Sequence, residues 1–235
     1  MIELSYPFWV GFLAMAGGAA AFVWGGVSAD REYRTYYGLL ASISLIAAVA
    51  YLLMAVEIGW VDVDGRTVFI PRYIDWILTT PLLLVFLGML AGIDRGTHVR
   101  VVAVNTVVMV AGFAGALLPG LERIALFAFA SVAYLGLLYL VVGPMTERAR
   151  DRADARRSLF TSLRNLTVVL WTVYPAIWLL GPPGVALLTP TIDVILVSYL
   201  DVLTKVGFGL IALNAGAVIE TEPGPSIAAE TGQPS

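Results

Sequence analysis

Cysteine is absent from this chain of 235 residues, and histidine occurs only once. A chain without cysteine has no disulfide framework and no thiolate ligand for zinc, which excludes the small domains that depend on either. Charged residues make up only 13% of the sequence, about half their share in a typical soluble domain. The net charge of −3 is mild and no basic stripe is present, so we expect no nucleic-acid partner. The sequence shows no metal-ligand cluster, phosphate-binding loop or hydrolytic triad, and we therefore expect neither a metal site nor an enzyme.

Apolar residues supply 59% of the chain and gather in long runs. Seven runs are about twenty residues long or longer, which is the length that a helix needs to cross the hydrocarbon core of a membrane. We therefore predict an all-α, multi-pass protein of the cell membrane, a seven-transmembrane-helix bundle over residues 1–219. The predicted spans are Leu4–Val27, Tyr36–Ile58, Pro71–Ile93, Val99–Leu118, Leu121–Val142, Leu159–Leu180 and Thr189–Ile219.

Arginines are distributed unevenly between the two sides that seven spans create. Ten lie in or beside the breaks after the first, third and fifth spans, whereas only Arg66 and Arg123 lie in the other breaks. The positive-inside rule then places the N-terminus outside the cell and the C-terminus inside. On the inner side, Thr146–Arg157 is interpreted as a charged loop.

Two segments outside the spans have distinct patterns. Val61–Phe69 carries Asp64 and Gly65 between β-branched residues, which predicts a short β-hairpin between the second and third spans. Residues 220–235 are rich in Pro, Gly, Ser and Glu, and we expect them to form a disordered cytoplasmic tail.

Four ionisable residues fall inside or near the predicted membrane core, namely Arg72, Asp75, Asp201 and Lys205. Charged residues are rare in transmembrane helices, and those that occur are commonly functional. Arg72 precedes Asp75 by three positions and Asp201 precedes Lys205 by four, so each pair shares a helix face. If the third and seventh spans pack together, Asp75 approaches Lys205 and all four charges cancel in one cavity. The alternative is a purely structural ion-pair cluster, although buried pairs seldom repay their desolvation cost.

Lys205 also has a chemical use, because a desolvated lysine is readily held neutral and a neutral amine can form a Schiff base with an aldehyde. Trp171, Tyr174 and Trp178 lie at positions i, i+3 and i+7 of the sixth span, and Trp76 lies on the third. Aromatic stripes at this spacing usually serve packing alone. Beside a buried lysine they can also clamp a flat, rigid polyene aldehyde.

Two motifs resemble the third- and seventh-helix signatures of the microbial (type I) rhodopsins. They are Arg72-Tyr73-Ile74-Asp75-Trp76-Ile77-Leu78-Thr79-Thr80-Pro81 and Asp201-Val202-Leu203-Thr204-Lys205-Val206-Gly207-Phe208-Gly209. The resemblance covers all seven spans. Within the family the chain is most similar to the archaeal sensory rhodopsin II group, through residues 165–171, 178–191 and 198–201.

The resemblance implies a role for each buried polar residue. Lys205 would hold all-trans retinal as a protonated Schiff base, with Asp75 as primary counterion and proton acceptor. Asp201 would be the second counterion, and Arg72 would organise charge and water on the outer side. The other pocket residues would be Trp76, Thr79, Thr80, Trp171, Tyr174, Trp178 and Thr204.

The resemblance implies a photoreceptor for light avoidance (negative phototaxis), and Phe86 bears on the alternative of a light-driven outward proton pump. Phe86 follows Asp75 by eleven residues, about three turns inward on the same face, where pumps similar to this chain carry a carboxylate. Phenylalanine cannot supply a proton, so we expect slow return of the proton and a long-lived deprotonated state. A non-photoactive structural membrane protein is a third alternative, which the residues around Lys205 argue against.

A sensor of this kind needs a partner in the membrane. Tyr199 is six residues before Lys205 and therefore points away from the chromophore side of its helix. By resemblance, Tyr199 and Thr189 would contact a two-helix transducer protein, and Thr204 with Tyr174 would link retinal to it. The alternative for Tyr199 is a side chain that faces lipid, and for Thr189 an ordinary residue at the start of a helix.

Overall fold

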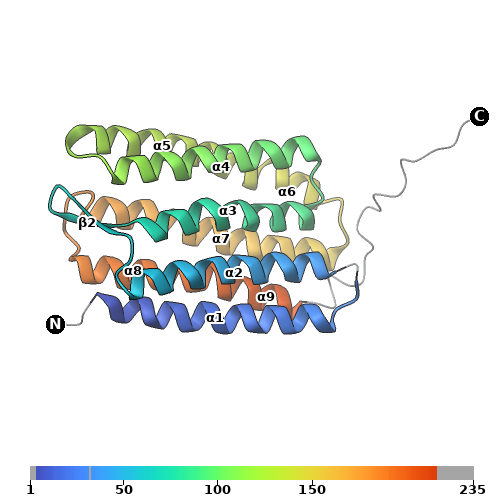
Figure 1. Ribbon diagram of the computed structural model, residues 1–235. Helices are drawn as coiled ribbons and strands as arrows, with labels where there is room; N and C mark the ends of the chain where they lie inside the picture. The colour runs from blue at the N-terminus through green and yellow to red at the C-terminus, as the bar shows by residue number, and fades with distance from the viewer. Residues whose placement is uncertain (1–3, 32, 216–235) are drawn as a thin grey trace, which may run out of the picture.

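The computed structural model describes residues 4–31 and 33–215. Within these residues, seven helical spans are long and apolar enough to cross a membrane, which confirms the predicted seven-helix, multi-pass architecture. The helices lie side by side as a bundle (Figure 1). The elements are α1 (Ser5–Ser28), α2 (Arg34–Ala55), β1 (Trp60–Val63), β2 (Arg66–Phe69), α3 (Ile70–Ala91), α4 (Arg95–Ala116), α5 (Gly120–Val142), α6 (Pro144–Ala149), α7 (Asp154–Leu180), α8 (Pro190–Val202), η1 (Leu203–Gly207) and α9 (Phe208–Asn214).

The predicted hairpin is confirmed, and it marks one end of the bundle. β1 and β2 pair antiparallel with Val63 opposite Arg66. Asp64 and Gly65 between them have φ values of 57° and 74°. Two consecutive positive φ values define a type I′ turn, whose twist matches that of the paired strands. We call this the hairpin end, and the opposite end, where α3 finishes and α6 lies, the far end (Figure 1).

Helical structure extends beyond the apolar runs at the far end, so the predicted loop Thr146–Arg157 is largely wrong. Pro144 stands in the first turn of the six-residue helix α6, and α7 begins at Asp154, five residues before the predicted start of its span. Glu and Arg in this segment are good helix formers, and Pro is favoured in a first helical turn. Hydropathy alone shows where a helix leaves the hydrocarbon core of the membrane. It does not show where the helix ends.

The last predicted span is confirmed as far as Asn214, where α9 ends. Within it, residues Leu203–Gly207 form a short π-helix, η1, that contains Lys205. Such insertions are rare and frequently mark functional sites. Residues 216–219 of the predicted span and the predicted disordered tail, 220–235, lie outside the described residues.

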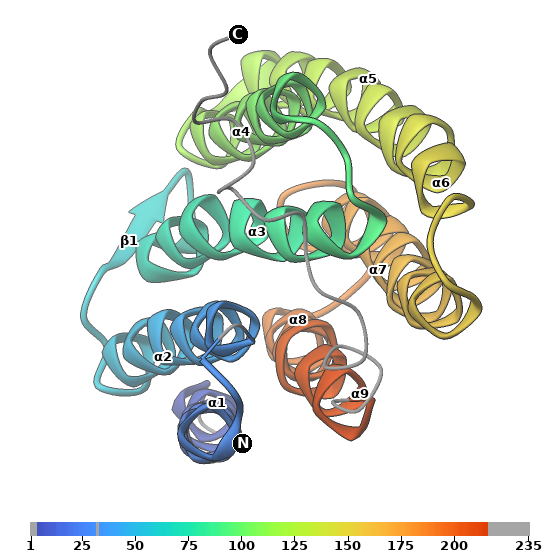
Figure 2. The same cartoon turned by 90° about the vertical axis from the view of Figure 1, so that its right-hand side faces the viewer.

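Helix α3 lies centrally, between the α4–α5 pair on one side and α1, α2, α8 and α9 on the other (Figure 2). The largest cluster of buried apolar residues among the described ones joins α1, α2, α3, α4, α5, α6, α7 and α9. The side chain of Asn105 on α4 donates to the Thr80 hydroxyl on α3 at 2.8 Å, and this buried hydrogen bond links the two helices. The outer faces expose large apolar side chains such as Trp24, Leu121 and Tyr139, as expected of helices in contact with lipid.

Candidate functional site

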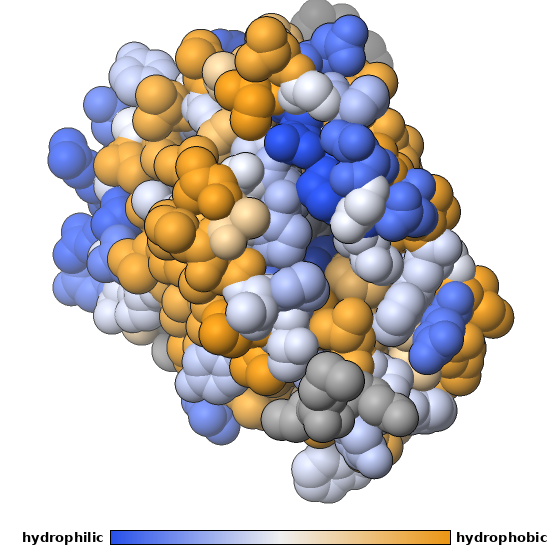
Figure 3. All heavy atoms as spheres, turned by 90° about the vertical axis from the view of Figure 1, so that its left-hand side faces the viewer, coloured by the Kyte–Doolittle hydropathy of each residue, from blue (hydrophilic) through white to orange (hydrophobic). Residues whose placement is uncertain are grey.

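A cavity of about 270 Å³ runs from the hairpin end into the bundle and reaches Lys205. The hairpin end is the face shown in Figure 3, where hydrophilic side chains gather among the apolar ones. The cavity walls come from the hairpin, α3, α4, α5, α7, α8 and η1. Nine of the predicted site residues line it: Arg72, Trp76, Thr80, Trp171, Tyr174, Trp178, Asp201, Thr204 and Lys205.

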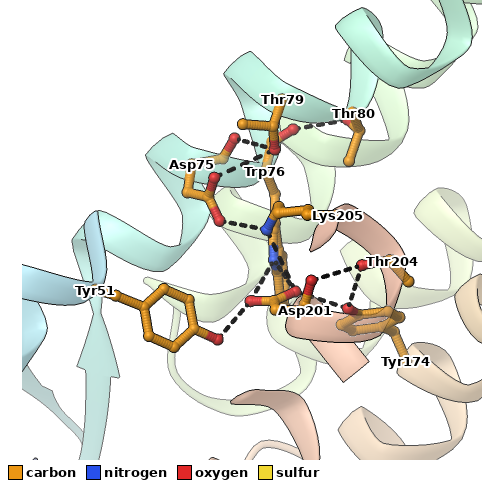
Figure 4. Close-up of polar contacts among 9 residues, drawn as sticks. All are labelled: Tyr51, Asp75, Trp76, Thr79, Thr80, Tyr174, Asp201, Thr204 and Lys205. Carbon is orange, nitrogen blue, oxygen red and sulfur yellow. Dashed lines mark hydrogen bonds and ion pairs between the residues drawn. The ribbon is translucent and has the colours of Figure 1, made fainter. Parts of the chain in front are cut away.

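Lys205 meets both predicted carboxylates, which confirms that the third and seventh spans pack against each other. Its Nζ lies 2.6 Å from Oδ2 of Asp75 and 3.5 Å from Oδ1 of Asp201. All three side chains are buried, and Figure 4 shows them converging from α3, α8 and η1. A buried cation between two carboxylates avoids the large cost of an isolated charge in the membrane core.

The two carboxylates differ in how many other donors they accept from. Asp201 accepts from the Tyr174 hydroxyl at 2.6 Å, the Tyr51 hydroxyl at 2.8 Å and Trp76 Nε1 at 3.1 Å. Besides Lys205, Asp75 accepts only from the Thr79 hydroxyl, at 3.2 Å, among the side chains of the described residues. Asp75 is therefore both the nearer carboxylate to Lys205 and the less stabilised one, which favours it as the proton acceptor.

Tyr51 is a site residue that the sequence reasoning missed. It lies on α2, fully buried, and its partner Asp201 is 150 positions away in the chain. The available signal was a single polar atom in an otherwise apolar run, because a buried tyrosine hydroxyl usually needs a partner. That signal gives no information on which partner is chosen.

The threonines occupy distinct positions around the charges. Thr79 donates to the Asp75 backbone carbonyl at 2.8 Å as well as to its carboxylate. Thr204 donates to the Asp201 backbone carbonyl at 3.2 Å, and its hydroxyl lies 3.5 Å from that of Tyr174. The structure thus brings the predicted Thr204 and Tyr174 pair together beside Asp201 (Figure 4).

Aromatic rings form much of the cavity wall, as the sequence predicted. The Trp76 and Tyr174 rings meet edge to face with centroids 5.3 Å apart. Trp178 stacks on Phe127 of α5 at 4.0 Å with an interplanar angle of 4°. Phe127 also lines the cavity, and the sequence reasoning missed it because nothing in the fifth span distinguishes it from a packing residue.

Arg72 lines the same cavity, but its ion pair differs from the one that the sequence suggested. Its Nη1 lies 3.6 Å from Oδ2 of Asp193 near the start of α8. Its guanidinium also stands 4.9 Å from the centre of the Phe69 ring, in cation–π range. The four charges therefore form two groups, one around Lys205 and one closer to the hairpin end, because Arg72 lies almost a turn before Asp75 on α3.

Phe86 lies where the far half of the bundle is closed by apolar packing. Its side chain is 0% exposed and meets the rings of Tyr36 and Phe208 edge to face, both at 5.3 Å between centroids. Asp75 and Asp201 are the only buried carboxylates among the described residues, and both contact Lys205. A proton can therefore leave the Lys205 nitrogen to an Asp75 oxygen 2.6 Å away. The described part of the far half offers no buried carboxyl group to return it.

The two residues predicted to meet a partner lie on the surface. The Tyr199 side chain is 64% exposed on α8, away from Lys205. Thr189 is exposed and caps α8, because its hydroxyl accepts from the Ile192 amide at 3.3 Å. Thr189 thus has a structural role that is sufficient to explain its position. In the described residues, no group of three or more His, Cys, Asp or Glu side chains could hold a metal ion.

Comparison with known proteins matches the family described as bacteriorhodopsin-like protein over residues 3–219. Sensory rhodopsin-2 of Natronomonas pharaonis is 59% identical over 97% of this chain and 95% of that protein. Sensory rhodopsin-2 of Haloarcula vallismortis is 42% identical over 97% of this chain and 99% of that protein. The crystal structure of the thermophilic rhodopsin from Rubrobacter xylanophilus superposes with a TM-score of 0.89 at 36% identity, over 92% of this chain and 97% of that one.

Proposed function

This chain belongs to the bacteriorhodopsin-like family, and on that premise we propose that it is a retinal-binding photoreceptor that signals light avoidance through a membrane transducer. The sensory assignment is supported by relatives named sensory rhodopsin-2, at 59% and 42% identity over nearly the whole chain. The observation that carries the proposal is the contact of Lys205 Nζ with the Asp75 carboxylate at the end of an aromatic cavity.

The residues present fit a covalently bound all-trans retinal. The cavity is lined by residues from the hairpin to the Lys205 amine, and Trp76, Trp171, Tyr174 and Trp178 are among its walls. Lys205 is also the only lysine in the sequence, so it is the only side-chain amine that an aldehyde can modify. When bound, retinal supplies light absorption and a change of shape on illumination.

The charged side chains around Lys205 have different electrostatic roles. Asp75 balances the positive charge at the Lys205 nitrogen and takes its proton after illumination, since the two atoms are 2.6 Å apart. Asp201, fixed by Tyr51, Trp76 and Tyr174, keeps its negative charge and remains the second counterion. Arg72 and Asp193 form a separate ion pair closer to the hairpin end, where a proton could leave.

A sensor is favoured over a proton pump by the apolar far half. Phe86, buried between Tyr36 and Phe208, cannot donate a proton to the Lys205 nitrogen. The deprotonated state should therefore persist, and a long-lived state gives a partner time to respond.

The partner surface and the orientation belong to the same proposal. The distribution of arginines supports an orientation with the far end in the cytoplasm and the N-terminus outside. Tyr199, exposed on α8, and Thr189 at the start of that helix would contact a two-helix transducer. Binding of the transducer to a Tyr199→Ala variant is the measurement that checks this contact, and undiminished affinity would rule it out.

The assignment of retinal to Lys205 is tested by reductive trapping. The protein is incubated with all-trans retinal, reduced with cyanoborohydride and digested, and the peptides are weighed. A single retinyl addition is expected on the peptide that contains Lys205, with visible colour before reduction. Lys205→Ala, checked for helical content, should show neither colour nor addition. A coloured Lys205→Ala pigment that resists hydroxylamine would contradict the proposal.

A further inference from the structure

Arg156 is a buried cation in the far half of the bundle that the proposed function does not use. It lies in the first turn of α7, and its side chain is only 2% exposed. Its Nη2 donates to the Tyr36 hydroxyl of α2 at 2.8 Å, and its guanidinium lies 5.9 Å from the centre of the same ring. Arginine is almost never fully buried without such partners, so the pair fixes the start of α7 against α2.

The Tyr36 ring is the first of three that cross the bundle. Tyr36 meets Phe86 of α3 edge to face at 5.3 Å, and Phe86 meets Phe208 of α9 in the same way at 5.3 Å. Phe208 follows Lys205 by three residues, on the side of Lys205 that leads to the far end. The row Tyr36–Phe86–Phe208 therefore stands between the Lys205 amine and the far surface, and Arg156 holds its outer member.

A second arginine ties the same segment to α3. Arg152, two residues before α7 begins, donates from Nε to the Ala91 carbonyl at 3.3 Å. Ala91 is the last residue of α3, where an unpaired carbonyl and the helix dipole both favour a cation. The entrance to α7 is thus fastened at two points, but only Arg156 reaches a ring of the row.

We propose that Arg156 is a positioning residue that holds Tyr36 against Phe86 and so limits how fast a proton returns from the far end to the Lys205 nitrogen. Water can reach that nitrogen from the far end only if the ring row opens. Opening requires Tyr36 to turn or α7 to move away from α2, and either motion breaks a buried, charge-assisted hydrogen bond. The inference rests on the proposed function, because the Lys205 nitrogen loses its proton only in the light-driven cycle.

The test uses two variants and a matched control. Tyr36→Phe keeps the ring and removes only the acceptor, whereas Arg156→Met keeps the length of the side chain and removes the charge. Arg157→Gln is the control, because Arg157 is the adjacent arginine, is exposed, and pairs only with Asp154 of its own helix, at 2.6 Å, among the ion pairs of the described chain. Arg156→Lys should retain part of the hold on Tyr36, since it keeps the positive charge.

The first measurement needs neither retinal nor light. Hydrogen–deuterium exchange of the retinal-free protein is followed in the peptides that cover the starts of α2 and α7. We expect exchange there to rise roughly ten- to hundredfold in both variants, the size expected when one charged hydrogen bond is lost from the closed state. The Arg157→Gln protein should exchange at the unmodified rate.

The second measurement follows the decay of the deprotonated state after a flash. We expect decay to accelerate by the same roughly ten- to hundredfold factor in Tyr36→Phe and Arg156→Met, with the dark absorption maximum unchanged. Exchange or decay that matches the Arg157→Gln control in both variants would overturn the inference. Faster exchange with unchanged decay would overturn it as well. If no deprotonated state forms even in the unmodified pigment, the proposed function fails independently of the exchange result.

Discussion

At the scale of single residues, the two carboxylates beside Lys205 have the same chemistry and different surroundings. Asp201 accepts hydrogen bonds from three aromatic side chains, whereas Asp75 accepts from one threonine besides Lys205. A carboxylate with more donors holds its negative charge more firmly. The proposed division into a fixed counterion, Asp201, and a proton acceptor, Asp75, therefore rests on the hydrogen bonds that neighbouring side chains donate to each carboxylate.

Replacing Asp75 by Asn should shift the absorption of the pigment to longer wavelength, because loss of the nearest anion narrows the gap between ground and excited states. Proton loss from the Lys205 nitrogen should slow by roughly 100-fold or more, the usual contribution of a positioned base. Absorption spectra and flash photolysis measure both effects. Asp193→Asn serves as the control, since Asp193 pairs with Arg72 and should leave proton loss intact. An unchanged spectrum in Asp75→Asn would show that another group is the primary counterion.

Replacing Tyr51 by Phe removes one donor to Asp201 and leaves the ring in place. We expect a loss of roughly 1–3 kcal/mol in the free energy of unfolding, because a hydrogen bond to a buried charge is lost. The pigment should also absorb at shorter wavelength, since Asp201 then stabilises the neighbouring cation more strongly. Thermal unfolding and absorption spectra of the variant test this, with Tyr139→Phe as the control because the Tyr139 side chain is 71% exposed. Equal stability of the two variants would argue against a structural role for the Tyr51 hydroxyl.

At the scale of single elements, the hairpin and the π-helix η1 differ in what produces them. The hairpin needs only a turn sequence between two β-branched strands, and its Asp64 and Gly65 adopt the two positive φ values of that turn. The π-helix has no comparable turn signal, and it places Lys205 between two carboxylates that lie on different helices. Local sequence therefore explains the hairpin. The π-helix has no such local explanation, and it occurs where Lys205 contacts carboxylates of two helices.

Replacing Gly65 by Ala tests the backbone of the hairpin alone, because a Cβ at this position would meet no atom within 4 Å. The φ of 74° is unfavourable for alanine, so we expect the hairpin to lose roughly 1 kcal/mol of stability. Hydrogen–deuterium exchange of β1 and β2 reports this directly. Gly136→Ala is the matched control, since Gly136 also has open space but lies inside helix α5. It should be neutral or stabilising by up to about 1 kcal/mol, and an equal loss in both variants would contradict the turn assignment.

At the scale of the whole molecule, the bundle is asymmetric along its length. Toward the hairpin end lie a cavity, the Arg72–Asp193 ion pair and the two carboxylates beside Lys205. In the far half, the described residues pack apolar side chains and the Tyr36–Phe86–Phe208 row, with Arg156 as the buried cation. Polar groups and a cavity therefore lie on one side of Lys205, and apolar packing closes the other side, which supports the proposed long-lived signalling state over a fast pump.

Replacing Phe86 by Asp should shorten the late part of the light cycle, because it places a proton donor in the closed half. We expect roughly a tenfold acceleration, less than a fully positioned general acid gives. Phe86→Asn is the matched control, since it removes the same ring without adding a proton. Flash photolysis with and without azide separates the cases, because azide should accelerate the unmodified and Asn proteins more than the Asp protein. Steady proton transport in vesicles as fast as that of a dedicated pump, and unaffected by azide, would reject the sensor.

The sequence alone determined the features that depend on neighbours along the chain. Apolar runs fixed the seven spans, Asp64 and Gly65 fixed the hairpin, and the i, i+4 spacing placed Asp201 beside Lys205. These follow from helix length in a membrane, turn chemistry and helical periodicity.

Only the tertiary structure decided which groups far apart in the sequence meet. Asp75 and Lys205 are separated by 130 positions, Tyr51 and Asp201 by 150, and Arg156 and Tyr36 by 120. Periodicity tells which face of its helix each residue occupies, but the rotation and crossing of packed helices determine the facing partner. For that reason the sequence predicted the lysine and its carboxylates, whereas the pairing of Arg72 with Asp193 and the tyrosines that fix Asp201 and Arg156 came from the fold.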